Sequence, residues 1–207
     1  MKRRRLWVTL VGVGAVAAGV TSWAITSHPM TANAPASKAT QARKAQEAAT
    51  LLQAGSLQVQ YRDYGGATQT FRRVLELDPH NKVAWYDLGV VAQQEGRAGD
   101  ARKAYDEALK IDPKYASALY NKAVLLKPSD PGQAVGLLRR AIAATPRAAT
   151  AHLQLGLILA QKDRDDEAEE EFGRAVAVDP SLHSAVPEEF RDKVSPTPTS
   201  SQAGATR

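Results

Sequence analysis

The chain contains no cysteine. Disulfide bonds, thiolate metal sites and cysteine nucleophiles are therefore excluded. Aromatic residues make up only 6% of the chain, whereas alanine is abundant. This composition favours helices that pack closely through small side chains.

The sequence also lacks a basic face. Its formal net charge is +5, and the residues Lys2, Arg3, Arg4 and Arg5 supply four of these charges at the N-terminal tip. A protein that binds nucleic acid needs a basic stripe on its folded part. We therefore expect no nucleic-acid partner.

Motifs for catalysis, cofactors and metals are missing as well. There is no glycine-rich phosphate loop, no serine nucleophile elbow and no pair of histidines at metal-ligand spacing. Asp163, Asp165 and Glu167 alternate as in a calcium loop, but Ala168 replaces the required glycine. Carboxylates also gather at helix starts because the helix dipole favours them there. We expect a non-enzymatic protein without a catalytic, cofactor or metal site.

One long apolar run is present, over residues 6–26. As a helix it would be about 31 Å long, which matches a hydrocarbon core of about 30 Å. Trp7 and Trp23 lie near its ends, where interfacial aromatic residues gather, and basic residues precede it. The pattern predicts a single transmembrane helix with residues 1–5 in the cytoplasm and the rest of the chain outside.

A cleaved signal peptide is the alternative, and it would release the protein by secretion. The small residues around Ala34 and Ala36 fit a cleavage site. The apolar run is longer than a signal peptide needs, and Pro35 would hinder cleavage after Ala34. Both interpretations place the folded part on the same side of the membrane.

Polar and proline-bearing segments flank the middle of the chain. Residues 27–40 predict a flexible spacer, and residues 195–207 predict a disordered tail. The middle carries a repeat: Pro79, Pro113, Pro146 and Pro180 each end a run of helical periodicity, at spacings of 34, 33 and 34 residues.

Each copy has the same arrangement of small and large residues. The first helical pattern of each copy contains a large residue and, four residues later, a small one, at Gly55, Gly89, Ala123 and Gly156. The second pattern contains an alanine and, four residues later, a large residue, at Phe71, Tyr105, Leu138 and Phe172. Spacings of three, four and eight place such residues on one helix face. Each copy is then a helical hairpin that needs neighbours to bury its apolar face.

This pattern resembles the tetratricopeptide repeat (TPR). The second copy is the most similar, with Trp85, Leu88, Gly89, Ala101, Tyr105 and Pro113 at the family's positions. The third copy departs most, with Lys122 where an apolar residue is usual. The resemblance implies an all-α, right-handed superhelical stack over residues 41–180, with units at about 48–81, 82–115, 116–148 and 149–182. Pro187 is expected to open a capping helix within residues 183–194.

Pro128 and Pro131 interrupt the third unit but not the repeat phase. We expect them to form the turn between the two helices of that unit, with Pro128 ending the first helix near Leu126 or Lys127. Asp130 fits a helix N-cap, Pro131 the first helical position and Gln133 the reciprocal residue of a capping box.

The resemblance implies that the first helices of successive units line a concave groove that binds an extended peptide or a partner helix. The residues predicted to face this groove are Leu52, Ser56, Val59, Val83, Tyr86, Asp87, Val90, Gln94, Tyr120, Asn121, Val124, Leu153, Gln154 and Leu157. They are mostly apolar with amides and tyrosines, which suits a ligand with apolar or aromatic side chains. They lack the several basic residues with which some TPR domains bind a carboxylate terminus.

The sequence therefore predicts a membrane-anchored protein-interaction scaffold, with bacterial envelope assembly as a setting. Two alternatives stay open. One is a structural subunit that self-associates through its groove or anchor as a homo-oligomer. The other is an accessory subunit of an envelope enzyme complex.

Overall fold

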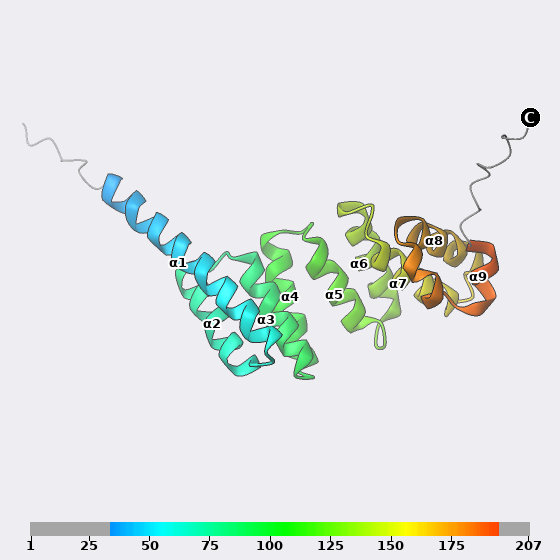
Figure 1. Cartoon of the computed structure of the whole chain (residues 1–207), viewed down its shortest axis with the longest axis horizontal. Coiled ribbons are helices and arrows are strands. Elements are labelled where there is room, and N and C mark those ends of the chain that lie inside the picture. The colour runs from blue at the N-terminus through cyan, green and yellow to red at the C-terminus, as the bar shows by residue number, and fades with distance from the viewer. Residues whose placement is uncertain (1–33, 195–207) are drawn as a thin grey trace, which may run out of the picture.

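The computed structural model describes residues 34–194, and every regular element in this range is helical. The elements form an elongated row from α1 to α9 (Figure 1). They are α1 (Ala34–Gln60), α2 (Tyr64–Leu77), α3 (Lys82–Gln94), α4 (Ala98–Ile111), α5 (Ala116–Leu126), α6 (Pro131–Ala144), α7 (Ala149–Ala160), α8 (Asp165–Val178), the 3-10 helix η1 (Pro180–Ala185) and α9 (Glu188–Val194).

Consecutive helices pack as four hairpins: α1 with α2, α3 with α4, α5 with α6 and α7 with α8. Each hairpin also packs against the next one along the chain. This is the all-α TPR stack that the sequence predicts. Each unit buries its apolar face partly against its neighbours, as the repeat architecture requires.

The small-to-large pairing of the repeat is visible inside three of the four hairpins. A Cβ atom on Gly89 would lie 2.4 Å from the ring of Tyr105, and one on Gly55 would lie 2.4 Å from the ring of Phe71. Gly156 meets Phe172 in the same way. Glycine is needed at these positions because the aromatic ring of the second helix occupies the space of a side chain.

Helix α1 begins earlier than the sequence predicts. It includes residues 34–40, which were expected to belong to the flexible spacer. The alanines of this segment favour a helix, and Pro35 is tolerated because the first turn does not need its missing N–H. Residues 37–47 are all exposed, and this part of α1 projects beyond the stack (Figure 1).

Three of the hairpin turns use one residue in the left-handed conformation. It is Arg62 (φ 60°) in the first unit, Gly96 (φ 73°) in the second and Asp163 (φ 56°) in the fourth. These residues occupy equivalent positions in the repeat. The third unit is one residue shorter as a whole, and its turn over residues 127–130 has no such residue.

The turn of the third unit, over residues 127–130, has the expected helix ends and N-cap but not the expected capping box. Helix α5 ends at Leu126 and α6 begins at Pro131, with Asp130 as its N-cap. The Asp130 carboxylate accepts a hydrogen bond from the Gln133 N–H at 2.9 Å. The Asp130 N–H donates to the Leu126 carbonyl at 2.7 Å, so the reciprocal bond of a capping box from Gln133 is not formed.

The C-terminal end of the stack is covered by η1 and α9. Val186, Phe190 and Val194 are buried, and the ring of Phe190 lies 5.2 Å from that of Phe172 in α8. Helix α9 therefore caps the last unit, and its start directly after Pro187 agrees with the prediction.

The predicted transmembrane helix at residues 6–26, the cytoplasmic tip and the tail at residues 195–207 lie outside the described range. Among the helices of residues 34–194, none combines the length and the hydropathy that crossing a membrane requires.

Candidate partner-binding groove

The predicted groove residues lie on the first helices of the four units, α1, α3, α5 and α7, or at their ends. Ser56 and Gln94 are exposed, and most of the others are half-buried. Leu153 is different, because it is only 6% exposed and belongs to the continuous hydrophobic core of α5 to α9. Leu153 therefore stabilises the stack and offers little surface to a partner.

Three tyrosines of the second unit meet in the middle of the stack. The ring of Tyr86 lies 5.4 Å from that of Tyr115 in an edge-to-face arrangement and 6.0 Å from that of Tyr105. The Tyr86 hydroxyl accepts a hydrogen bond from Asn121 Nδ2 at 3.0 Å, which connects α3 to α5. The Tyr105 hydroxyl donates to Gln93 Oε1 at 2.9 Å. These contacts hold the aromatic rings in fixed positions.

A pocket of about 390 Å³ opens beside these tyrosines. It is formed by residues of α3, α5, α6 and α7 and of the adjoining turns. The lining residues are Tyr86, Ala116, Ser117, Tyr120, Asn121, Ala141, Thr145, Ala148, Thr150 and Ala151. Its size suits one or two side chains of a bound segment, with hydroxyl and amide groups at its wall.

Two of the three predicted amides already have partners within the chain. Asn121 donates to Tyr86, and Gln154 Oε1 accepts from Lys127 Nζ at 3.2 Å. An amide has an oxygen with two acceptor sites and an NH2 group with two donors, so each side chain retains hydrogen-bonding capacity for a partner.

Several pocket residues were not predicted from the sequence. Ser117 and Thr150 occupy the repeat position of Val83, so a strict comparison of the units would have found them. Thr145 lies just after α6, a second helix, and no pattern of the first helices points to it.

Asp87 is the acidic residue of the predicted groove. Burial raises the pKa of its carboxyl from 3.8 to about 6. Burial also raises the pKa of Tyr86 and of Tyr115, and the negative charge of Asp87 adds to both shifts. Asp87 directly follows Tyr86 in α3.

His152 has a structural role. Its ring is buried, with Nδ1 2.6 Å from Glu171 Oε2 and Nε2 3.0 Å from the Pro146 carbonyl. Trp85, at the same repeat position, donates its indole N–H to the Pro79 carbonyl at 3.1 Å. The histidine thus reproduces the bond that tryptophan makes to the repeat-ending proline.

Lys122 also contributes to the stack. Its side chain is 15% exposed, and its ammonium pairs with the Asp106 carboxylate of α4. A charged residue is accepted at this usually apolar position because the neighbouring unit supplies an opposite charge.

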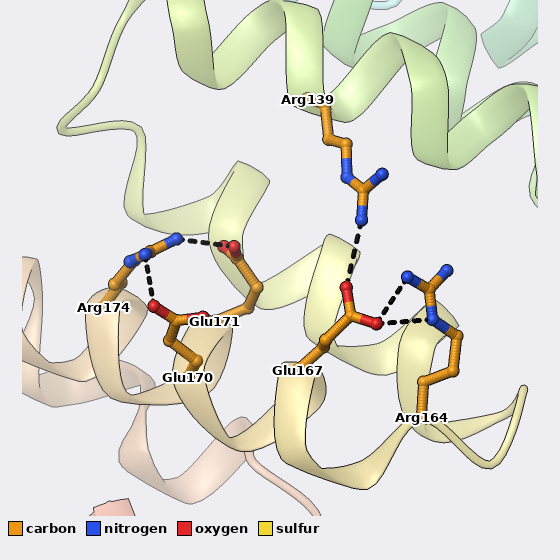
Figure 2. Close-up of polar contacts among 6 residues, drawn as sticks. All are labelled: Arg139, Arg164, Glu167, Glu170, Glu171 and Arg174. Atoms are coloured by element: carbon orange, nitrogen blue, oxygen red, sulfur yellow. Dashed lines mark hydrogen bonds and ion pairs between the residues drawn. The ribbon is translucent and has the colours of Figure 1, made fainter.

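The acidic run at the start of α8 is paired with arginines (Figure 2). Glu167 bonds to Arg139 of α6 at 3.1 Å and to Arg164 Nε at 2.8 Å, and Arg174 bonds to Glu171 at 2.8 Å. Glu167, the last residue of the calcium-like alternation, therefore lies against guanidinium groups.

A second pocket, of about 560 Å³, lies between α2, α3 and α4. It is lined by Trp85 and Leu88 together with the charged side chains of Arg97, Asp100 and others. Arg97 pairs with Asp100 at 2.9 Å, so part of its charge is neutralised within the wall. It contains none of the predicted groove residues.

Two family models, both described as tetratricopeptide repeat, match the chain at residues 58–124 and 123–182. Among curated proteins, the human protein O-mannosyl-transferase TMTC3 is 28% identical over 125 residues. The match covers 58% of this chain but only 14% of the human protein.

Solved structures include similar stacks. The pilF protein of Pseudomonas aeruginosa is 25% identical with a TM-score of 0.63, and the match covers 68% of this chain and 65% of that one. YrrB, a TPR protein with an unusual peptide-binding site, is 25% identical with a TM-score of 0.59, over 72% of this chain and 77% of that one.

The repeat spacing, the hairpin packing and the two adjoining family matches agree on one assignment. The chain belongs to the tetratricopeptide-repeat family, whose helical stacks serve as scaffolds for protein–protein interaction.

Proposed function

We propose that the protein is a non-enzymatic scaffold that binds a peptide or a helix of a partner protein in the groove of α3, α5 and α7. The observation that carries this proposal is the fixed tyrosine and amide surface around Tyr86 and Asn121, next to a pocket of about 390 Å³. Aromatic side chains with a polar end are common anchors of protein interfaces. The peptide-binding site of YrrB supports the same use of this fold.

The proposal includes a membrane anchor at residues 6–26, with the repeat domain outside the cytoplasm and a setting in bacterial envelope assembly. The uncharged run and the basic residues before it support this arrangement. A reporter fused after Arg207 tests the topology, because activity of a cytoplasm-dependent reporter would contradict it.

The groove is tested with the double variant Tyr86→Ala/Tyr120→Ala. Partners are captured by crosslinking in intact cells, and the variant is expected to lose them while it keeps its helical content. The matched control is Arg102→Ala/Lys103→Ala, two exposed residues of α4. Undiminished capture by the tyrosine variant would refute binding through the groove.

Self-association is a second candidate, favoured by the N-terminal end of the stack. Leu57 occupies the repeat position of Val91, which is fully buried against Ala67 and Phe71 of the preceding unit. No unit precedes α1 within the described residues, so Leu57 is 52% exposed and Tyr61 is 79% exposed. If copies associate at this end, Leu57→Glu should shift the chain to monomer in sedimentation.

A further inference from the structure

Asp87 and Asn121 occupy equivalent positions in the second and third units, 34 residues apart. Asn121 donates a hydrogen bond to Tyr86 of the preceding unit. In the first unit, Leu52 takes the repeat position that Tyr86 has in the second unit. The side chain of Leu52 cannot form a hydrogen bond, so it cannot pair with Asp87 as Tyr86 pairs with Asn121. Within the described residues, the Asp87 carboxylate consequently has neither a hydrogen bond nor an ion pair.

Three lysines of α3, α5 and the end of α5 have other partners. Lys82 of α3 lies 2.6 Å from Asp112, and its ammonium is also 5.1 Å from the centre of the Tyr115 ring. Lys122 pairs with Asp106, and Lys127 donates to Gln154. These lysines therefore leave the charge of Asp87 without a counter-charge.

Tyr86, the residue before Asp87 in α3, belongs to a cluster of three tyrosine rings. Tyr86 contacts the rings of Tyr105 and Tyr115, and the pKa values of all three hydroxyls are raised, first by burial and further by neighbouring groups that include Asp87. An unpaired carboxylate in a half-buried site is unfavourable by itself. A cation would compensate it through an ion pair and through attraction to the aromatic faces.

We propose that Asp87, together with Tyr86 and Tyr115, binds a lysine or arginine side chain of the partner segment in the groove. This inference rests on the proposed function and names the chemistry of the partner. The expected ligand is an apolar peptide or helix that carries a basic residue, which sets the cation beside Asp87 while apolar side chains enter the neighbouring pocket. A purely apolar or aromatic ligand, as the sequence suggested, would leave the carboxylate uncompensated.

The test uses the full chain and a set of fluorescently labelled peptides with one common Ala–Leu–Gln framework. The peptides differ only at their central residues, which are all Arg, all Lys, all Gln or all Glu in a given peptide. Fluorescence anisotropy at neutral pH should show the Arg and Lys peptides binding about tenfold more tightly than the Gln peptide, with the Glu peptide weakest. The protein has a net charge of +5, so non-specific electrostatic attraction alone would make the Glu peptide bind most tightly and the Arg and Lys peptides least tightly.

The variant Asp87→Asn should abolish the advantage of the Arg and Lys peptides, whereas the exposed control Asp192→Asn should retain it. The inference is overturned if basic peptides bind no better than the Gln peptide, if their advantage survives Asp87→Asn, or if no peptide binds. A Gln peptide that binds equally well and depends on Tyr86 and Tyr120 would overturn only the inference and leave the proposed function standing.

Discussion

At the scale of single residues, the glycines of the first helices are required because an aromatic ring of the second helix packs against them. Gly89 has the ring of Tyr105 at the place of a side chain, whereas Gly136, inside α6, has no neighbouring atom within 4 Å of an added Cβ. The two residues are therefore a matched pair: one glycine is required by packing, and the other only weakens its helix.

We expect opposite effects when alanine replaces these two glycines. Gly89→Ala should lower the free energy of unfolding by about 1–3 kcal/mol, because the buried ring must move. Gly136→Ala should raise it by about 0.5–1 kcal/mol through helix propensity and chain entropy. Urea denaturation followed by circular dichroism measures both, and two changes of the same sign would contradict the packing account.

Asp87 should make stability depend on pH. Its carboxyl has a pKa of about 6 in the folded chain and 3.8 as its ordinary value. The folded chain then holds a proton that the unfolded chain has released, so the contribution of Asp87 to stability falls as the pH rises through this window.

Asp87→Asn should remove this dependence. The variant should be more stable than the natural chain at neutral pH by about 1 kcal/mol, after allowance for the solvent that still reaches the group. The difference in the free energy of unfolding between the two proteins should shrink towards zero below pH 3.8, the ordinary pKa of the carboxyl. Urea titrations of both proteins across the window measure it, and a difference that stays constant with pH would contradict the raised pKa of Asp87.

At the scale of elements, the third unit shows how a repeat with one residue fewer is accommodated: α5 has 11 residues, whereas α3 has 13. The other three units use a left-handed residue, whereas the third uses Pro128 to end α5 and Asp130 to start α6. The side chain of Asp130 bonds to the helix start, but the side chain of Gln133 does not complete a capping box.

Asp130→Ala should therefore lower the free energy of unfolding by about 1 kcal/mol, the usual value of an N-cap. Gln133→Ala is the control and should change it by less than about 0.5 kcal/mol, as surface substitutions do. Equal losses in the two variants would mean that a complete capping box forms in solution.

Much of this element structure was predictable because it depends on residues near each other in sequence. The repeat phase placed the hairpins, and the prolines placed the turn of the third unit and the start of α9. The extra turns of α1 were missed because Pro35 and the polar composition suggested a spacer, although alanine favours a helix.

The groove was less predictable, because the sequence gives the face of a residue but not its depth in the stack. Leu153 has the repeat position of Tyr86 and Tyr120, yet it is buried in the core of the later units. Thr145 reaches the pocket from the end of a second helix, a contact that only the packing of α6 against its neighbours produces. The unpaired state of Asp87 follows from Leu52, a residue of another unit.

At the scale of the whole molecule, the two ends of the stack differ. The C-terminal end is closed by α9 over α8, whereas the N-terminal end exposes Leu57 and Tyr61 and continues into the projecting part of α1 (Figure 1). Between them, α3 and α5 present the tyrosine surface. The central claim is that a partner binds there and not on the outer helices.

Site-specific photo-crosslinking in intact cells tests this claim most directly. A photoreactive residue is placed either at Ser117, an exposed residue of the groove pocket, or at Arg102, an exposed residue of α4. We expect a discrete adduct with a partner protein from Ser117 and none from Arg102. Adducts from Arg102 in the absence of any from Ser117 would contradict the account.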